Sequence, residues 1–179
     1  MNEVVIGGKT FRVLLSEEKI LSRVADLGKQ IVSEYAGKDY LAICVLKGGF
    51  IFAADLIRNM QPHPVIQFVR LSSYGDGMES SGKMREMLGI EEDVSGRHIL
   101  IIEDIVDNGN TLAWLREKFL SRHAASVKMV TLLFKPDAYK GLNPPEYIGF
   151  EIPNAFVIGY GLDFGDEGRG LRSIYSLNP

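Results

Sequence analysis

Three carboxylates and a short polar turn stand together near the middle of the chain, in the segment ILIIEDIVDNGNTL at residues 99–112. An apolar run ends there in two adjacent acids, Glu103 and Asp104. The polar turn that follows and the start of a helical pattern contain Asp107, Asn108, Gly109, Asn110 and Thr111. Carboxylates bind hydroxyls or a metal ion, whereas turn amides and a helix N-terminus bind an anion. The spacing therefore predicts a site for a phosphorylated sugar with vicinal hydroxyls.

The acidic pair has a simpler explanation, which is a solvated acidic strand end. Two neighbouring carboxylates on an apolar strand repel each other, so the pair is costly unless a ligand or cation accompanies it. The fixed offsets from this pair to Asp107, Gly109 and Thr111 favour a binding site.

The composition is that of an ordinary globular protein, with 179 residues, 46 % apolar and 24 % charged. We expect one domain over residues 1–179. A net charge of −3 and a pI near 5.7 give no reason to expect nucleic acid or an anionic membrane as partner. A single cysteine, Cys44, excludes an internal disulfide and lies in an apolar run, which indicates a core residue in a reducing cytoplasm. Neither a signal-peptide pattern nor a run long enough to span a bilayer is expected.

Apolar periodicity predicts the elements that position these residues. Helices are expected over 16–35 and 50–60 and around the stripe Leu112, Leu115, Phe119, and strands over 41–46, 65–71, 98–102, 127–134 and 155–160. Alternating strands and helices predict an α/β fold with a mainly parallel twisted sheet flanked by helices, whose ligands lie at the carboxyl ends of the strands. The terminal segments are expected to form a small hood over that edge. Residues 72–86 are polar and glycine-rich, which predicts a long functional loop.

The string EDIVDNGNT resembles the phosphoribosyl pyrophosphate (PRPP) binding motif of the type I phosphoribosyltransferases. The resemblance implies that Glu103 and Asp104 hold the ribose hydroxyls, and that the loop amides and Thr111 hold the 5′-phosphate. Most members have Thr or Ser where this chain has Asn108. Either a hydroxyl contact to phosphate is lost there, or the amide NH2 replaces it as donor.

Further motifs resemble the hypoxanthine-guanine phosphoribosyltransferases. The string VLKGG at 45–49 is similar to their pyrophosphate loop, which implies roles for Lys47 and Gly48 and a cis peptide bond before the lysine. Ser73 and Tyr74 match the pair in the flexible catalytic loop, expected at about 72–86, and Arg169 matches an arginine that meets pyrophosphate. A plain turn, a polar loop and a surface arginine are the respective alternatives.

The resemblance extends to a purine pocket. Lys135 follows a strand at the position where the family places the lysine that donates to O6 of a 6-oxopurine. An ammonium group can only donate hydrogen bonds, so it would be mismatched against the amino group of adenine. Phe156 would stack on the base, and the carbonyls of Val157 and Asp163 would meet its pyrimidine edge. The carboxylate of Asp163 would serve Mg²⁺ directly or through water, and Glu103 and Asp104 are further candidate ligands. A solvated lysine and a core aromatic are the alternatives for Lys135 and Phe156.

Five separated motifs between Leu46 and Arg169 carry the resemblance. It implies transfer of the 5-phosphoribosyl group from PRPP to N9 of hypoxanthine or guanine, with Mg²⁺ as cofactor and Asp107 as general base toward N7. A xanthine-preferring enzyme and a PRPP- or nucleotide-sensing regulator of the same fold are the alternatives. The expected partners are these small-molecule substrates, without nucleic acid or membrane, and a homo-oligomer, dimer or tetramer, by analogy with the family.

Overall fold

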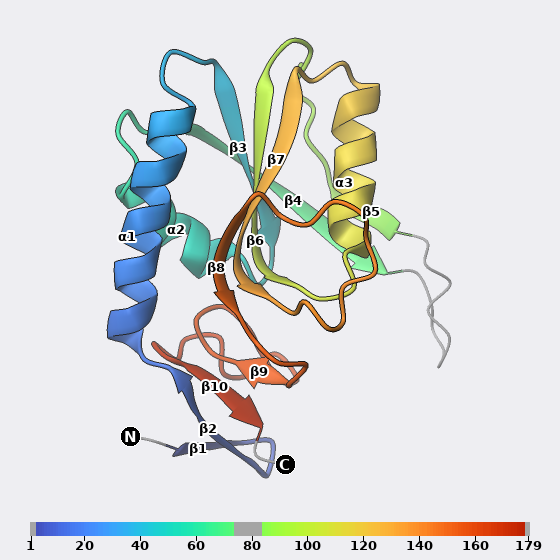
Figure 1. Ribbon diagram of the computed structural model, residues 1–179. Coiled ribbons are helices and arrows are strands. Elements are labelled where there is room, and N and C mark those ends of the chain that lie inside the picture. Colours follow the sequence, from blue (N-terminus) through green and yellow to red (C-terminus); the bar gives the residue numbers. More distant parts are fainter. Residues whose placement is uncertain (1–2, 74–83, 178–179) are drawn as a thin grey trace.

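Two β-sheets and three helices make up the chain in the computed structural model, which describes residues 3–73 and 84–177 (Figure 1). The larger sheet has six strands in the order β5-β4-β3-β6-β7-β8. Its strands are β3 (Tyr40–Leu46), β4 (Val65–Ser73), β5 (Met84–Leu88), β6 (His98–Val106), β7 (Ser126–Phe134) and β8 (Tyr147–Glu151). All neighbours pair in parallel except β4 and β5, which are antiparallel. The predicted mainly parallel sheet is confirmed.

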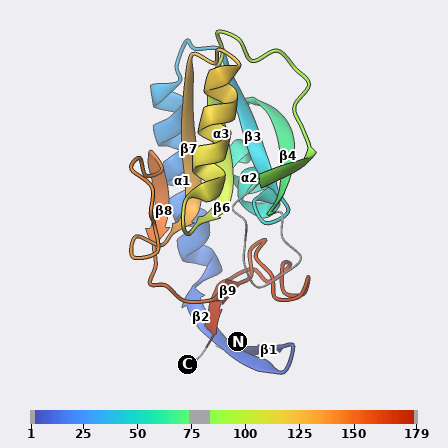
Figure 2. The same ribbon diagram turned by 90° about the vertical axis from the view of Figure 1, so that its right-hand side faces the viewer.

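Helices cover both faces of the larger sheet. Figures 1 and 2 show α1 (Glu17–Glu34) and α2 (Phe50–Arg58) on one face and α3 (Asn110–Ser121) on the other. Each face has its own buried apolar cluster, one containing α1 and α2 and the other containing α3. Ser16 caps α1 by accepting from the backbone N–H of Lys19. Within the described residues, no helix is both long and apolar enough to cross a membrane.

The smaller sheet is the predicted hood and joins both ends of the chain. Its strands are β1 (Glu3–Ile6), β2 (Lys9–Leu15), β10 (Ile174–Leu177) and β9 (Val157–Ile158), in that order across the sheet. All of its pairings are antiparallel. In Figure 1 the hood lies at the lower end of the molecule, beyond the carboxyl end of β8.

Two predicted elements need correction here, and two strands of the larger sheet were not predicted. The segment 155–160 is not a strand of the larger sheet, because only Val157–Ile158 form a strand and they pair with β10. The two strands that were not predicted are β5 and β8, the outermost strands of this sheet, because an edge strand of five residues has too short an apolar pattern. The long loop is shorter than 72–86: residues 72–73 extend β4 and 84–86 begin β5. Alternation is weak in β5 since it lies at the edge of the sheet.

Cys44 is a core residue, as predicted. Its side chain is fully buried in β3. Burial raises the pKa of the thiol to about 12, so a thiolate is not available at neutral pH.

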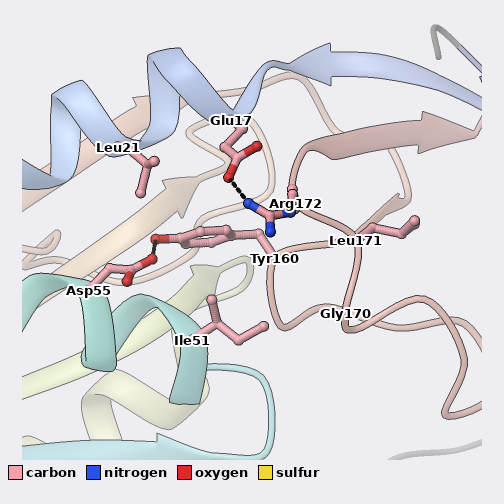
Figure 3. Close-up of a pocket in the computed structure, with 8 residues that line it drawn as sticks. All are labelled: Glu17, Leu21, Ile51, Asp55, Tyr160, Gly170, Leu171 and Arg172. Carbon is pink, nitrogen blue, oxygen red and sulfur yellow. Dashed lines mark hydrogen bonds and ion pairs between the residues drawn. The ribbon is translucent and has the colours of Figure 1, made fainter.

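The hood is tied to the core by two polar contacts around a cavity of about 250 Å³ (Figure 3). The Tyr160 hydroxyl donates to Asp55 Oδ2 of α2 at 2.6 Å. Arg172 Nη1 pairs with Glu17 Oε1 at the start of α1 at 2.7 Å. Burial, and then the hydrogen bond to Asp55, raises the pKa of Tyr160, so the phenol remains a donor. These contacts fix the segment around Tyr160 against helices α1 and α2.

Tyr160→Phe is expected to lower the free energy of unfolding by about 1 kcal/mol, because it removes one partly buried hydrogen bond to a carboxylate. For a chain of this size that loss corresponds to a decrease in Tm of about 2–4 °C. Differential scanning calorimetry measures the change. An unaltered Tm would show that this contact does not hold the hood.

Candidate active site

The acidic strand does not end at Ile102 as predicted, because β6 continues through the two acids to Val106. It pairs with β7 over this extension, with Glu103 opposite Thr131. Glu103 and Asp104 are therefore buried, with exposed fractions of 8 % and 7 %. Burial raises the pKa of Glu103 well above its usual range, and the charge of Asp104 raises it further. Burial also raises the pKa of Asp104, although the nearby Arg169 guanidinium opposes that shift.

Glu103 has an oxygen that lacks a partner. Its Oε2 is buried and receives no hydrogen bond from the described residues. A buried carboxylate oxygen without a donor is unstable by about 1–3 kcal/mol, so a ligand hydroxyl or a cation would stabilise it. This observation favours the binding explanation of the acidic pair over the solvated strand end.

The turn after β6 forms a small pocket of about 90 Å³ at the start of α3. It is lined by Glu103, Ile105, Val106, Asp107, Asn108, Gly109, Thr111 and Leu112. Gly109 precedes the helix with φ of 86°, a left-handed conformation that favours glycine. The Asn108 Oδ1 accepts from the backbone N–H of Asn110 at 2.9 Å. The side-chain oxygen of Asn108 is thus used within the turn, which leaves its amide NH2 as the donor for a ligand.

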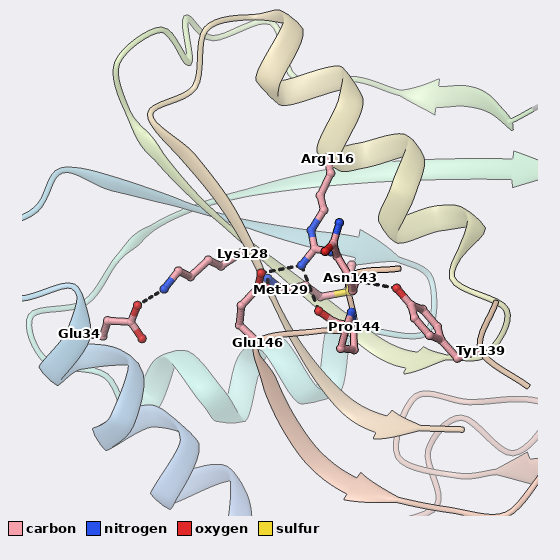
Figure 4. A network of polar contacts seen from close by, with 8 residues as sticks. All are labelled: Glu34, Arg116, Lys128, Met129, Tyr139, Asn143, Pro144 and Glu146. Atoms are coloured by element: carbon pink, nitrogen blue, oxygen red, sulfur yellow. Dashed lines mark hydrogen bonds and ion pairs between the residues drawn. The ribbon is translucent and has the colours of Figure 1, made fainter. Parts of the chain in front are cut away.

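A loop that the sequence did not single out braces this turn. The Tyr139 ring lies against Gly109, where an added Cβ would come within 2.4 Å of Cε2. The Tyr139 hydroxyl donates to the carbonyl of Asn143 at 2.6 Å. Arg116 of α3 donates to the same carbonyl and pairs with Glu146, as Figure 4 shows. The only signal for Tyr139 in the sequence is its position four residues after Lys135.

Asp107 and Lys135 are brought together by the parallel pairing of β6 and β7. Val106 and Phe134 are opposite each other in the register, so the next residue of each strand lies at the same edge. Lys135 Nζ pairs with Asp107 Oδ2 at 2.9 Å. The Lys135 side chain is buried, whereas that of Asp107 is about half exposed at 51 %. Lys135 is therefore not the solvated surface lysine of the alternative explanation.

The turn after β3 packs directly against the acidic strand and the hood. An ideal Cβ on Gly48 would lie 1.6 Å from Asp104 Oδ2, and one on Gly161 would lie 2.0 Å from the carbonyl oxygen of Gly48. Only hydrogen fits at both contacts. The Leu46–Lys47 peptide bond is cis, as the resemblance predicts.

Four charged side chains meet between this turn and the hood. Arg169 Nη2 pairs with Asp163 Oδ1 at 2.7 Å, and Arg169 Nη1 donates to the carbonyl of Gly161 at 2.9 Å. Lys47 Nζ pairs with Asp166 Oδ1 at 2.7 Å. Asp166 is not among the predicted site residues, although its place in the turn FGDE indicates an exposed acid at a hairpin tip.

Phe156 differs from a core aromatic. It is 47 % exposed, and its ring packs edge-on against Phe164 with centroids 5.7 Å apart. Val157, next in the chain, is buried in β9. The exposed side of the Phe156 ring is therefore free to stack on a planar ligand.

The predicted pair in the catalytic loop is only partly described. Ser73 is the last residue of β4, at the carboxyl end of the strand next to β3. Tyr74 lies outside the described residues.

Comparisons with known proteins agree with this geometry. Residues 13–165 match the family model described as phosphoribosyl transferase domain. Hypoxanthine-guanine phosphoribosyltransferase of Bacillus subtilis is 46 % identical over 168 residues, covering 94 % of this chain and 93 % of the relative. The enzyme of the same name from Mycobacterium tuberculosis is 43 % identical, covering 93 % and 86 %.

A solved structure shares the fold. The crystal structure of a hypoxanthine phosphoribosyltransferase from Staphylococcus aureus has a TM-score of 0.89 and 39 % identity, covering 94 % of this chain and 91 % of that one. This chain belongs to the phosphoribosyltransferase family and, within it, to the family of the hypoxanthine-guanine phosphoribosyltransferases.

Proposed function

We propose that the protein transfers the 5-phosphoribosyl group from PRPP to N9 of hypoxanthine and guanine, forming the nucleotide monophosphate and pyrophosphate. The observation that carries the proposal is the Asp107–Lys135 pair at the edge of the sheet, beside the phosphate-sized pocket. N7 and O6 are neighbours on one edge of a 6-oxopurine. An acceptor and a donor 2.9 Å apart match a proton on N7 and the oxygen at O6.

The residues divide the chemistry between them. The backbone amides of 108–111 and the Thr111 hydroxyl hold the 5′-phosphate at the N-terminus of α3. Glu103 and Asp104 accept from the ribose hydroxyls and favour the positive charge that develops at C1. Asp107 takes the N7 proton as N9 attacks C1, so it acts as general base. Phe156 stacks on the base, and the backbone carbonyls of Val157 and Asp163 select its pyrimidine edge.

The donor set suits Mg²⁺ that arrives with PRPP. Within the described residues, no three His, Cys, Asp or Glu side chains are grouped to hold a metal by themselves. Mg²⁺ is ordinarily held by one or two carboxylates together with substrate phosphates and waters. Such carboxylates are available at Asp163 and at Glu103, whose Oε2 has no partner among the described residues and which lies beside Asp104. When bound, the ion neutralises charge on the leaving pyrophosphate.

The test is nucleotide formation from magnesium PRPP with hypoxanthine, guanine, xanthine and adenine in parallel. Turnover of hypoxanthine and guanine without adenine supports the proposal. Faster turnover of xanthine would indicate a xanthine-preferring enzyme. Binding of PRPP without turnover of any base would indicate a regulator of the same fold.

Lys135→Met is expected to raise KM for hypoxanthine by roughly 10–100-fold, because the buried ammonium no longer donates to O6. The dissociation constant of PRPP should change less than about threefold, since the lysine lies at the edge of the site that meets the base. Steady-state kinetics and calorimetric PRPP titration separate the two effects. An equal loss of both affinities would show that Lys135 is structural.

A cytoplasmic location and a homo-oligomer, dimer or tetramer, are part of the same proposal and rest on the family alone. Sedimentation velocity of the full chain tests the oligomeric state.

A further inference from the structure

Lys47 and Arg169 are the two cations that the family resemblance assigns to pyrophosphate. In this structure both bind the same carboxylate oxygen, which belongs to Asp166. Lys47 Nζ lies 2.7 Å and Arg169 Nη2 lies 3.2 Å from Asp166 Oδ1. The hydrogen bond from Lys47, and then that from Arg169, lowers the pKa of Asp166, so this carboxylate is ionised at neutral pH. A single anionic oxygen between two cations is the arrangement that an oxygen of pyrophosphate would adopt.

Asp166 is held in this place by a tight turn. Phe164 and Glu167 exchange two backbone hydrogen bonds of 2.9 and 3.2 Å, with Gly165 and Asp166 between them. Both intervening residues have positive φ, 61° and 66°, as a type I′ hairpin requires. The backbone N–H of Asp166 also donates to Asp163 Oδ2 at 2.8 Å. The turn therefore presents Asp166 to the cations from a short hairpin whose backbone is internally bonded.

The local charge balance makes this contact matter for an anionic ligand. Lys47 and Arg169 contribute two positive charges, and Asp163 and Asp166 contribute two negative charges. The cluster is neutral as it stands, although its ligand is strongly anionic. Asp163 is part of the proposed magnesium and purine site, whereas Asp166 has no role there. Asp166 is also the more exposed acid of the two, with 72 % of its side chain accessible. Its carboxylate can therefore move away from the cations directly into water.

We infer that Asp166 is an internal competitor for the pyrophosphate site: its carboxylate holds Lys47 and Arg169 in the free enzyme and must be displaced when PRPP or pyrophosphate binds. The inference rests on the proposed function and adds to it a residue that sets the affinity for the diphosphate group. After transfer, Asp166 can recapture the cations as pyrophosphate departs, which favours product release. When a competitor occupies the site, the apparent association constant of the ligand is its intrinsic value multiplied by the fraction of molecules in which the site is free.

The test is calorimetric titration of the full chain with magnesium pyrophosphate, comparing wild type, Asp166→Asn and Glu167→Gln. Asparagine tolerates positive φ, so Asp166→Asn keeps the turn while removing the charge. It is expected to bind pyrophosphate roughly 3- to 10-fold more tightly than wild type, from the loss of two exposed ion pairs. KM for PRPP should fall in parallel.

Glu167→Gln is the matched control, because it removes one negative charge from the next residue of the same turn. Glu167 is exposed, and no ion pair involving it occurs among the described residues. The affinity of the Glu167→Gln variant for pyrophosphate should stay within about twofold of wild type, as expected for a screened surface charge. Equal tightening in both variants would overturn the inference in favour of a general charge effect.

Unchanged or weaker pyrophosphate binding by Asp166→Asn would also overturn the inference, since it would make Asp166 a positioning group for Lys47 and Arg169. In that case wild-type turnover of hypoxanthine would leave the proposed function intact. A wild-type protein that neither binds pyrophosphate nor forms nucleotide would instead refute the proposed function, and the competitor role with it.

Discussion

Replacement of Asp107 by alanine is expected to lower kcat for nucleotide formation by roughly 10²–10⁴-fold, the range for loss of a general base. The N7 proton then has no acceptor as N9 attacks C1. Lys135, which is buried, also loses its carboxylate partner at 2.9 Å. Single-turnover and steady-state assays with hypoxanthine measure the loss.

Asp137→Ala provides the control for Asp107→Ala. Asp137 is an exposed acid two residues after Lys135, and its removal changes the net charge equally. It should leave kcat within about twofold, because an isolated surface charge is screened by solvent and salt. Near-normal turnover of Asp107→Ala would remove this residue from the role of general base and leave Lys135 as the principal group at that edge.

Gly48→Ala is expected to reduce kcat/KM for PRPP by at least roughly 100-fold, since misplacing reacting groups by about 1 Å has effects of that size. The added methyl group would lie 1.6 Å from Asp104 Oδ2 and 2.5 Å from its Cγ. Either the acidic pair or the turn that carries Lys47 must move. Overpacking of this kind also lowers the free energy of unfolding by about 1–3 kcal/mol. Urea denaturation and PRPP kinetics measure the two effects.

The matched control for Gly48→Ala is Gly170→Ala, because an ideal Cβ at Gly170 meets nothing within 4 Å and its φ lies outside the left-handed region. Its stability and its kcat/KM should be near those of wild type. If Gly48→Ala behaved like Gly170→Ala, the close contact between the turn and Asp104 would not be essential for the geometry of the site.

The local motifs were predictable because their residue types and spacing are themselves the chemistry. Two acids, a turn with Gly109 and a following helix at the carboxyl end of a parallel strand predict an anion site beside a hydroxyl site. The apolar runs of β3, β6 and β7 are continuous because these strands are interior to the sheet and covered by helices on both faces. The hood could be predicted because the terminal segments lie outside the alternating pattern of strands and helices.

Edge elements were predicted poorly for a physical reason. β5 and β8 are the outermost strands of the larger sheet, so fewer neighbours impose a hydrophobic pattern on them. The segment that contains Val157 is apolar enough for an interior strand, but its partner is β10, more than 15 residues later in the chain. Periodicity reports that a segment is buried and does not report which sheet it joins.

The family, the mainly parallel sheet and most of the residues around the site could be predicted from the sequence, because each depends on local order along the chain. Which of these residues contact one another depends on how the strands pair and the sheets pack. The 2.9 Å ion pair of Asp107 with Lys135 follows from the register of β6 and β7. The close approach of Gly48 to Asp104 follows from the pairing of β3 with β6. The contact of Asp166 with Lys47 depends on how the hood docks on the larger sheet. Contacts between residues 28 to 119 positions apart leave no trace in local pattern, since packing and strand register alone create them.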